Sequence, residues 1–247
     1  MKDVPGDYYR RLAEVDDGHW WTRGMLELDL ALLRPWLERE PHALLDAGCG
    51  TGAFLVNASR RVPSAALYGV DLSPEAIGIA HGRVPTAELS IAPLSALPFA
   101  DASFDVVVAN DVLQHIDESE LSPSLAEVRR VLAATGAFLV RTNGARRGRR
   151  ERSDWRLYDR STLRAHLEQG GFSVRRITYA NFLFSLVAEL RRRGPRAPTG
   201  RTCGIPAEPG AIGSALGRAT LGLETVVISR HGHVPWGHTL VAVAVPR

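Results

Sequence analysis

The chain has 247 residues, of which 45% are hydrophobic and 23% are charged, and its formal net charge is +3. This balance is that of an ordinary folded protein and excludes a long disordered or low-complexity chain. The small net charge gives no reason to expect a nucleic-acid partner, and no apolar run reaches the length of a membrane span.

The two cysteines, Cys49 and Cys203, form neither a disulfide framework nor the spacing of a metal site. The first residues are polar and do not read as a secretory leader. We therefore expect a cytoplasmic protein without a metal ion and without stable membrane insertion.

Helical and strand patterns alternate along the chain. Helices are predicted over residues 5–37, 53–61, 119–132, 161–169, 183–193 and 211–223, and one begins at Ser73 with Pro74 in its first turn. Strands are predicted over residues 42–47, 65–70, 88–92, 104–109, 137–140, 172–177 and 239–245. This alternation predicts an α/β fold with a mostly parallel sheet and helices on both faces.

A glycine-rich loop over residues 44–52 (Leu-Leu-Asp-Ala-Gly-Cys-Gly-Thr-Gly) follows the first predicted strand. Glycines at such a turn let the backbone approach a ligand closely, and the next helix offers free N–H groups. Asp71 ends the following strand, where an acidic side chain can accept both hydroxyls of a ribose.

The same geometry describes a dinucleotide site, because Gly48, Gly50 and Ala53 match the corresponding glycine pattern. Asp46, two residues before the first glycine, favours a ligand with a positive amino group and disfavours a pyrophosphate. A dinucleotide-dependent oxidoreductase therefore stays as an alternative interpretation.

Four stretches together resemble the class I methyltransferases that use S-adenosyl-L-methionine (SAM): residues 44–52, 68–73, 97–107 and 111–116. The resemblance implies a Rossmann-like sheet of about seven strands, with the last strand inserted antiparallel. It also implies one domain over residues 1–247, comprising an N-terminal helical lid (1–40), a SAM-binding core (41–180), a helical and loop insertion (181–236) and a last strand (237–247).

The resemblance carries cofactor contacts over by position. The loop of Asp46, Ala47, Gly48, Cys49 and Gly50 would hold the methionine end of SAM, Asp71 the ribose and Leu72 the adenine, with Asn110 and Asp111 near the transferred methyl. One position departs from the family, since Ala92–Pro93 replaces a Gly-Asp pair whose carboxylate reads the adenine. Pro93 and Leu94 are therefore expected as contacts by position only.

The segment His19-Trp20-Trp21-Thr22-Arg23-Gly24 is similar to one that precedes the core in a subset of bacterial class I methyltransferases. There it would form a lid, with Trp21 and Arg23 touching SAM and with Tyr8 and Trp20 touching the acceptor. The alternative is that the tryptophans only pack a helix against the sheet.

His115, just past the fourth strand, is the candidate general base, and His19 is a weaker one. The alternative for His115 is a residue that braces a loop. Six arginines crowd the loop after the fifth strand and border the expected acceptor site, where Arg156 and Tyr158 are candidate acceptor contacts: Arg146, Arg147, Arg149, Arg150, Arg152 and Arg156. These arginines could equally be solvated.

An apolar stripe over residues 182–190 is expected to cover the site, to make a homodimer contact or to touch a lipid. The predicted activity is transfer of a methyl group from SAM to a small acceptor, such as a secondary metabolite or a sugar intermediate, leaving S-adenosyl-L-homocysteine. A SAM-binding protein without methyl transfer is the second alternative.

Overall fold

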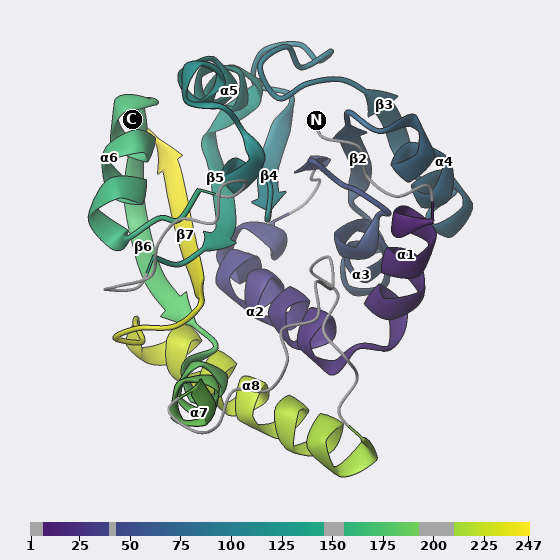
Figure 1. The fold of residues 1–247 in the computed structure, drawn as a ribbon. Helices are drawn as coiled ribbons and strands as arrows, with labels where there is room; N and C mark the ends of the chain where they lie inside the picture. Colours follow the sequence, from purple (N-terminus) through teal and green to yellow (C-terminus); the bar gives the residue numbers. More distant parts are fainter. Residues whose placement is uncertain (1–6, 40–42, 146–155, 193–209) are drawn as a thin grey trace.

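The structure is a computed structural model, and it describes residues 7–39, 43–145, 156–192 and 210–247 (Figure 1). The strands are β1 Ala43–Ala47, β2 Ala66–Asp71, β3 Glu88–Ile91, β4 Phe104–Asn110, β5 Leu132–Asn143, β6 Phe172–Ala180 and β7 Thr239–Pro246. The helices are α1 Tyr8–Gly18, α2 Trp20–Leu37, α3 Ala53–Arg61, α4 Pro74–Arg83, α5 Glu118–Val131, α6 Arg160–Gln169, α7 Phe182–Arg192 and α8 Ala211–His231, with a short 3-10 turn at Leu113–His115.

The seven strands form one sheet in the order β3-β2-β1-β4-β5-β7-β6. β1 to β5 run parallel, and β7 lies antiparallel between β5 and β6. The predicted Rossmann-like sheet of about seven strands, with its last strand inserted antiparallel, is thus confirmed. The chain order reverses at β1 and β4, so a crevice is expected outside the carboxyl ends of these two strands.

Alternate side chains of the central strands enter two separate cores. Val106 and Val108 of β4 face the core built with α2, α3 and α8, whereas Val107 and Ala109 face the core built with α5 and α6. These β4 side chains are completely buried, as expected for a strand covered on both faces. Figure 1 shows α2 crossing one side of the sheet while α5 and α6 lie toward the other.

The N-terminal segment forms two helices, where the sequence predicted continuous helical structure. His19 separates them in an extended conformation (φ −71°, ψ 123°). Helix α2 then buries an apolar stripe against the sheet that includes Met25, Leu26 and Leu33. The break turns α1 away from α2, toward α3 and α4 (Figure 1).

Helix α8 extends eight residues beyond the predicted end at Leu223, to His231. It contains β-branched residues that favour strands, but it buries Leu221 and Ile228 against α2. Tertiary packing therefore decides the length of this helix. No helix in the described part of the chain is long and apolar enough to cross a bilayer.

Candidate functional site

The glycine loop wraps around the ends of β1 and β2. Gly48, Gly50 and Gly52 have φ angles of +88°, +51° and +81°, a region that favours glycine. The N–H groups of Gly48 and Cys49 each donate to the carbonyl of Val70 at 2.8 Å. A Cβ atom on Gly48 would lie 2.3 Å from Val112, whereas one on Gly50 would meet no atom within 4 Å. The loop is therefore packed at Gly48 and open at Gly50.

Asp71 joins this loop to the end of β2. One carboxylate oxygen accepts the N–H of Gly50 at 2.9 Å, and the other accepts the N–H of Ser73 at 2.9 Å. Each oxygen keeps a lone pair for a further donor, which matches the expected role in accepting ribose hydroxyls.

Asp46 lies in the core at the end of β1, with 2% of its surface exposed. Its Oδ1 atom is buried and has no hydrogen-bond partner. Burial raises the pKa of this carboxyl group to about 8, and the positive charge of Arg141 only partly opposes the effect. A buried carboxyl group with an unmatched oxygen is suited to a cationic ligand group.

An ion-pair network that the sequence analysis missed lies beside Asp46. Arg141, at the end of β5, contacts Asp29 of α2 at 2.5 Å and Asp111 at 3.1 Å. Asp29 is completely buried, and burial raises its pKa to about 7. The available signals were a carboxylate within the apolar run of α2 and an arginine directly after a buried strand segment.

The other end of the site is apolar. Leu72, directly after β2, is 54% exposed, and Ile91, at the end of β3, is 57% exposed. The two adjoin because Asp71 pairs with Ile91 in the sheet. Pro93 is exposed nearby, whereas Leu94 is buried. Exposed apolar side chains at two strand ends fit the flat face of an adenine.

These features together fit SAM. Three carboxyl groups lie close enough to Arg141 to interact with its charge: Asp29, Asp46 and Asp111. Asp71 in turn lies close enough to Asp46 to affect its pKa. The positive ammonium and sulfonium groups of the ligand would favour the ionised forms of these carboxyl groups. In the described residues no three His, Cys, Asp or Glu side chains gather as a metal site.

Three residues that were predicted to contact SAM differ from the others in their surroundings. Ala47 and Cys49 are buried, and the Cys49 N–H already donates to the Val70 carbonyl. Arg23 lies exposed on α2, and the buried guanidinium at this site belongs to Arg141.

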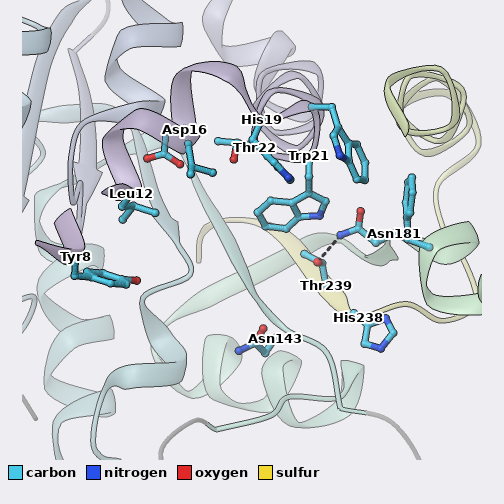
Figure 2. Close-up of a pocket in the computed structure, with 13 residues that line it drawn as sticks. Tyr8, Leu12, Asp16, His19, Trp21, Thr22, Asn143, Asn181, His238 and Thr239 are labelled. Carbon is cyan, nitrogen blue, oxygen red and sulfur yellow. Dashed lines mark hydrogen bonds between the residues drawn. The ribbon is translucent and has the colours of Figure 1, made fainter. Parts of the chain in front are cut away.

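A cavity of about 420 Å³ lies next to this site, at the ends of β5, β6 and β7. Figure 2 shows Tyr8, Leu12 and Asp16 of α1 on one side, Asn181, Thr239 and His238 on the other, and Trp21 between them. Val15, His19, Trp20, Thr22, Asn143 and Phe184 complete the lining. The cavity begins at β5, the strand that pairs with β4, so it adjoins the Asn110–Asp111 end of the cofactor site.

The polar atoms of this cavity are concentrated where β5, β6 and β7 end. The amide nitrogen of Asn181 donates to the Thr239 hydroxyl at 2.7 Å, a contact drawn in Figure 2. The other amide atom of Asn181, Oδ1, and the Nδ2 of Asn143 are buried and have no hydrogen-bond partner. A ligand in the cavity could therefore bond to both amides.

Tyr8 and Trp20, which were predicted to contact the acceptor, line this cavity, and so does His19, the weaker candidate base. Trp21, which was predicted to contact SAM, lines it as well. Thr22 of the same segment also lines the cavity. The other polar residues of the lining could not be predicted from the sequence, because Asp16 lies on α1 outside any motif and the rest lie at strand ends or in loops. These are Asp16, Asn143, Asn181, His238 and Thr239.

Arg156 and Tyr158 do not line the cavity. Tyr158 is completely buried and donates its hydroxyl hydrogen to the Leu113 carbonyl at 3.2 Å, so it packs in the core. Arg156 pairs with Glu118 at 2.8 Å. The other five loop arginines that the sequence analysis considered lie outside the described residues.

His115 also lies outside the cavity lining, on the 3-10 turn after β4. Its side chain is exposed on one side, while the protein on the other side lowers its pKa and the charge of Asp111 opposes this shift. The lowered pKa favours the neutral imidazole, but the histidines that line the acceptor cavity are His19 and His238.

Comparison with known proteins agrees with this geometry. A family described as a methyltransferase domain matches residues 45–140. The malonyl-[acyl-carrier protein] O-methyltransferase of Geobacter sulfurreducens is 34% identical over 195 residues, which cover 69% of this chain and 70% of that protein. The demethylmenaquinone methyltransferase of Chlorobaculum parvum is 37% identical over 103 residues, 42% of this chain and 41% of that protein.

The chain belongs to the class I SAM-dependent methyltransferases.

A solved structure shares the fold of this methyltransferase along its length. The TehB-like SAM-dependent methyltransferase from Corynebacterium glutamicum aligns over 98% of this chain and 97% of its own, with a TM-score of 0.62 and 18% sequence identity. SAM is therefore the methyl donor of the methyltransferase, and neither the oxidoreductase nor the non-catalytic alternative is retained.

Proposed function

We propose that this methyltransferase transfers the methyl group of SAM to a hydroxyl group of a small, neutral and largely apolar acceptor held in the cavity. The composition of the cavity wall carries the proposal. Its described lining holds aromatic and aliphatic side chains, one carboxylate (Asp16), and neither arginine nor lysine. An anionic acceptor would lose its hydration here without gaining an opposite charge.

The size and the polar groups of the cavity support a compact acceptor. A volume of about 420 Å³ is within the range of small-molecule sites, and a ring-shaped body would pack on Trp20, Trp21 and Phe184. The amides of Asn143 and Asn181 would orient the polar substituents. Among the predicted acceptors, a hydroxylated secondary metabolite suits this lining better than a sugar phosphate.

The two relatives are named for different acceptors, so their names do not identify the acceptor of this chain. The cytoplasmic location and the homodimer also stay predictions.

Bound SAM supplies a methyl group that its positive sulfur already activates. The chain's own residues would then hold the rest of the molecule: Asp46 would bind the ammonium group, Asp71 would accept the ribose hydroxyls, and Leu72 with Ile91 would cover the adenine. The aromatic side chains of Trp20 and Trp21 exclude water, and alignment of the acceptor supplies most of the rate enhancement.

Incubation of the full chain with methyl-labelled SAM and pairs of aromatic hydroxyl compounds tests the proposal. Each pair consists of a neutral compound and an analogue of similar size with an added carboxylate or phosphate. We expect labelled ether and S-adenosyl-L-homocysteine from neutral members, detected by mass spectrometry. Turnover of the anionic members alone would refute the proposed acceptor class.

A further inference from the structure

His238 lies in the loop just before β7 and lines the acceptor cavity, and several contacts hold it in place. Its carbonyl accepts the N–H of Gly144 at 2.8 Å, and its own N–H donates to the Ser185 hydroxyl at 2.9 Å. The preceding residue, Gly237, packs so closely on β6 that a Cβ atom there would lie 1.9 Å from the Ala180 carbonyl oxygen. The position of this histidine is therefore fixed by β5, β6 and α7.

The Ser185 hydroxyl determines which nitrogen of the imidazole carries hydrogen. Ser185 is completely buried, and its single hydroxyl hydrogen is donated to the Asn181 carbonyl at 2.5 Å. Its oxygen also lies 2.5 Å from Nδ1 of His238. Since that hydroxyl hydrogen is already used, Nδ1–H must be the donor in this contact. Neutral His238 then carries its lone pair on Nε2.

Asn181 holds Ser185 in place, which completes a relay of hydrogen bonds from Asn181 through Ser185 to His238. It has φ +65°, a conformation that asparagine tolerates better than most residues, at the junction of β6 and α7. Its carbonyl accepts both the N–H and the hydroxyl of Ser185, and its amide donates to Thr239, the residue after His238. A base whose ring is oriented by a second, fixed side chain is the arrangement found in acid–base catalysis.

We propose that His238, oriented by Ser185 and Asn181, is the general base of the reaction. The inference rests on the proposed function. As the acceptor oxygen forms its bond to the methyl carbon, its proton passes to Nε2 of His238. The electron pair of the broken sulfur–carbon bond stays on sulfur, so the positive charge moves from sulfur to the imidazolium.

The other two histidine candidates lack this arrangement. His115 does not line the cavity. His19 lines it, and its ring packs beside Trp20 at a centroid distance of 5.5 Å, whereas the ring of His238 contacts the Ser185 hydroxyl.

An NMR experiment that needs no enzymatic reaction tests which ring nitrogen of His238 carries the hydrogen. Two-bond ¹H–¹⁵N NMR spectra of the full chain, labelled at histidine, are recorded for the wild type, for His238→Asn to assign the signal, and for Ser185→Ala. We expect His238 in the wild type to be the Nδ1–H tautomer at neutral pH, and Ser185→Ala to shift it toward a mixture. An Nε2–H tautomer in the wild type would overturn the proposal.

Activity with a neutral hydroxyl acceptor tests the catalytic role. Asparagine can keep the hydrogen bond to Ser185 but cannot accept the proton, so His238→Asn should lower the rate at saturating SAM by about 10²–10⁴-fold. SAM affinity measured by calorimetry should stay unchanged. The wild-type rate should fall in acid as His238 becomes protonated, and this fall should be absent in the variant. His81→Asn, on the exposed side of α4, serves as the control and should react at the wild-type rate.

The outcomes separate this inference from the proposed function. If His238→Asn methylates the hydroxyl acceptor at the wild-type rate, or if only His19→Asn loses the rate, the assignment of His238 is wrong while the proposed function stands. If the wild type accepts no hydroxyl compound, the proposed function fails, and the base role fails with it.

Discussion

The carboxyl group of Asp46 is placed in the core at the end of β1, where water cannot stabilise its charge. Burial raises its pKa to about 8, so the free protein holds this proton at neutral pH. A ligand with a positive ammonium group favours the ionised form. SAM and its product are therefore expected to bind with the release of a proton from Asp46.

Release of this proton makes the binding of the ligand depend on pH. The affinity for S-adenosyl-L-homocysteine should rise between about pH 6 and pH 8, by up to about tenfold per pH unit, and level off above the pKa of Asp46. Asp46→Asn should bind more weakly and lose the slope. Calorimetry in buffers of different ionisation enthalpy measures both the affinity and the proton released.

The exposed Asp101 offers the control, since Asp101→Asn should keep the wild-type slope. A pH-independent affinity in the wild type would contradict the role given to Asp46. The same linkage has a second consequence for the free protein. Between pH values of about 4 and about 8, Asp46 holds its proton in the folded state but not in the unfolded state, so its contribution to the free energy of unfolding should fall as the pH rises through this range.

Helix α1 is joined to the glycine loop by a contact between side chains. The Thr51 hydroxyl donates to Asp16 of α1 at 3.0 Å, and Arg83 of α4 donates to the Thr51 hydroxyl at 3.0 Å and to its carbonyl at 2.6 Å. Because α1 also lines the cavity with Tyr8 and Leu12, we propose that this contact holds the helix closed as a lid.

Thr51→Val should loosen the lid, because valine has the shape of threonine but no hydroxyl. Loss of a hydrogen bond of about 1 kcal/mol corresponds to a several-fold weaker affinity for S-adenosyl-L-homocysteine. The α1 residues Arg10 and Arg11 provide tryptic sites, so cleavage there should be faster in the variant and slower with ligand.

Thr86→Val, at an exposed position before β3, is the matched control. Cleavage of Thr51→Val at the wild-type rate, with or without ligand, would show that the contact does not hold the lid. A lid test by truncation should stop before His19, since the buried side chains of Trp20 and Met25 belong to the core.

At the scale of the whole molecule, the long helices α2 and α8 approach closely because each presents a glycine to the other. A Cβ atom on Gly217 of α8 would lie 2.6 Å from Trp20, and one on Gly24 of α2 would lie 2.5 Å from Leu221. Trp20 in turn packs on Phe184 of α7 at a centroid distance of 4.4 Å. This contact connects the insertion to the N-terminal segment and forms one wall of the cavity.

Gly217→Ala should therefore destabilise the protein although alanine favours helices. Overpacking of a close contact costs about 1–3 kcal/mol, and each kcal/mol lowers the melting temperature by roughly 2–4 °C in a chain of this size. Gly222→Ala lies on the same helix, where a Cβ atom meets nothing within 4 Å, and should stabilise by about 0.5–1 kcal/mol. Equal melting shifts in the two variants would contradict close packing at Gly217.

Local patterns determined the fold class and the cofactor end of the site. The alternation of helices and strands predicted the sheet, and the capping role of Ser73 and the bounds of α3 agreed with the structure. Asp46, Gly50 and Asp71 were also identifiable, because they belong to one strand–loop–helix unit and the strand beside it. Such features depend on turn chemistry and periodicity, which neighbouring residues express.

Only the tertiary structure brought together the acceptor cavity, the buried pair of Arg141 and Asp29, and the relay from Asn181 through Ser185 to His238. Their members lie far apart in the sequence: 112 residues separate Arg141 from Asp29, and 53 separate His238 from Ser185. A side chain at a strand end or in a loop has no periodic pattern that marks it. What surrounds it depends on which strands pair and which helices cover them, and that is decided by packing of the whole chain.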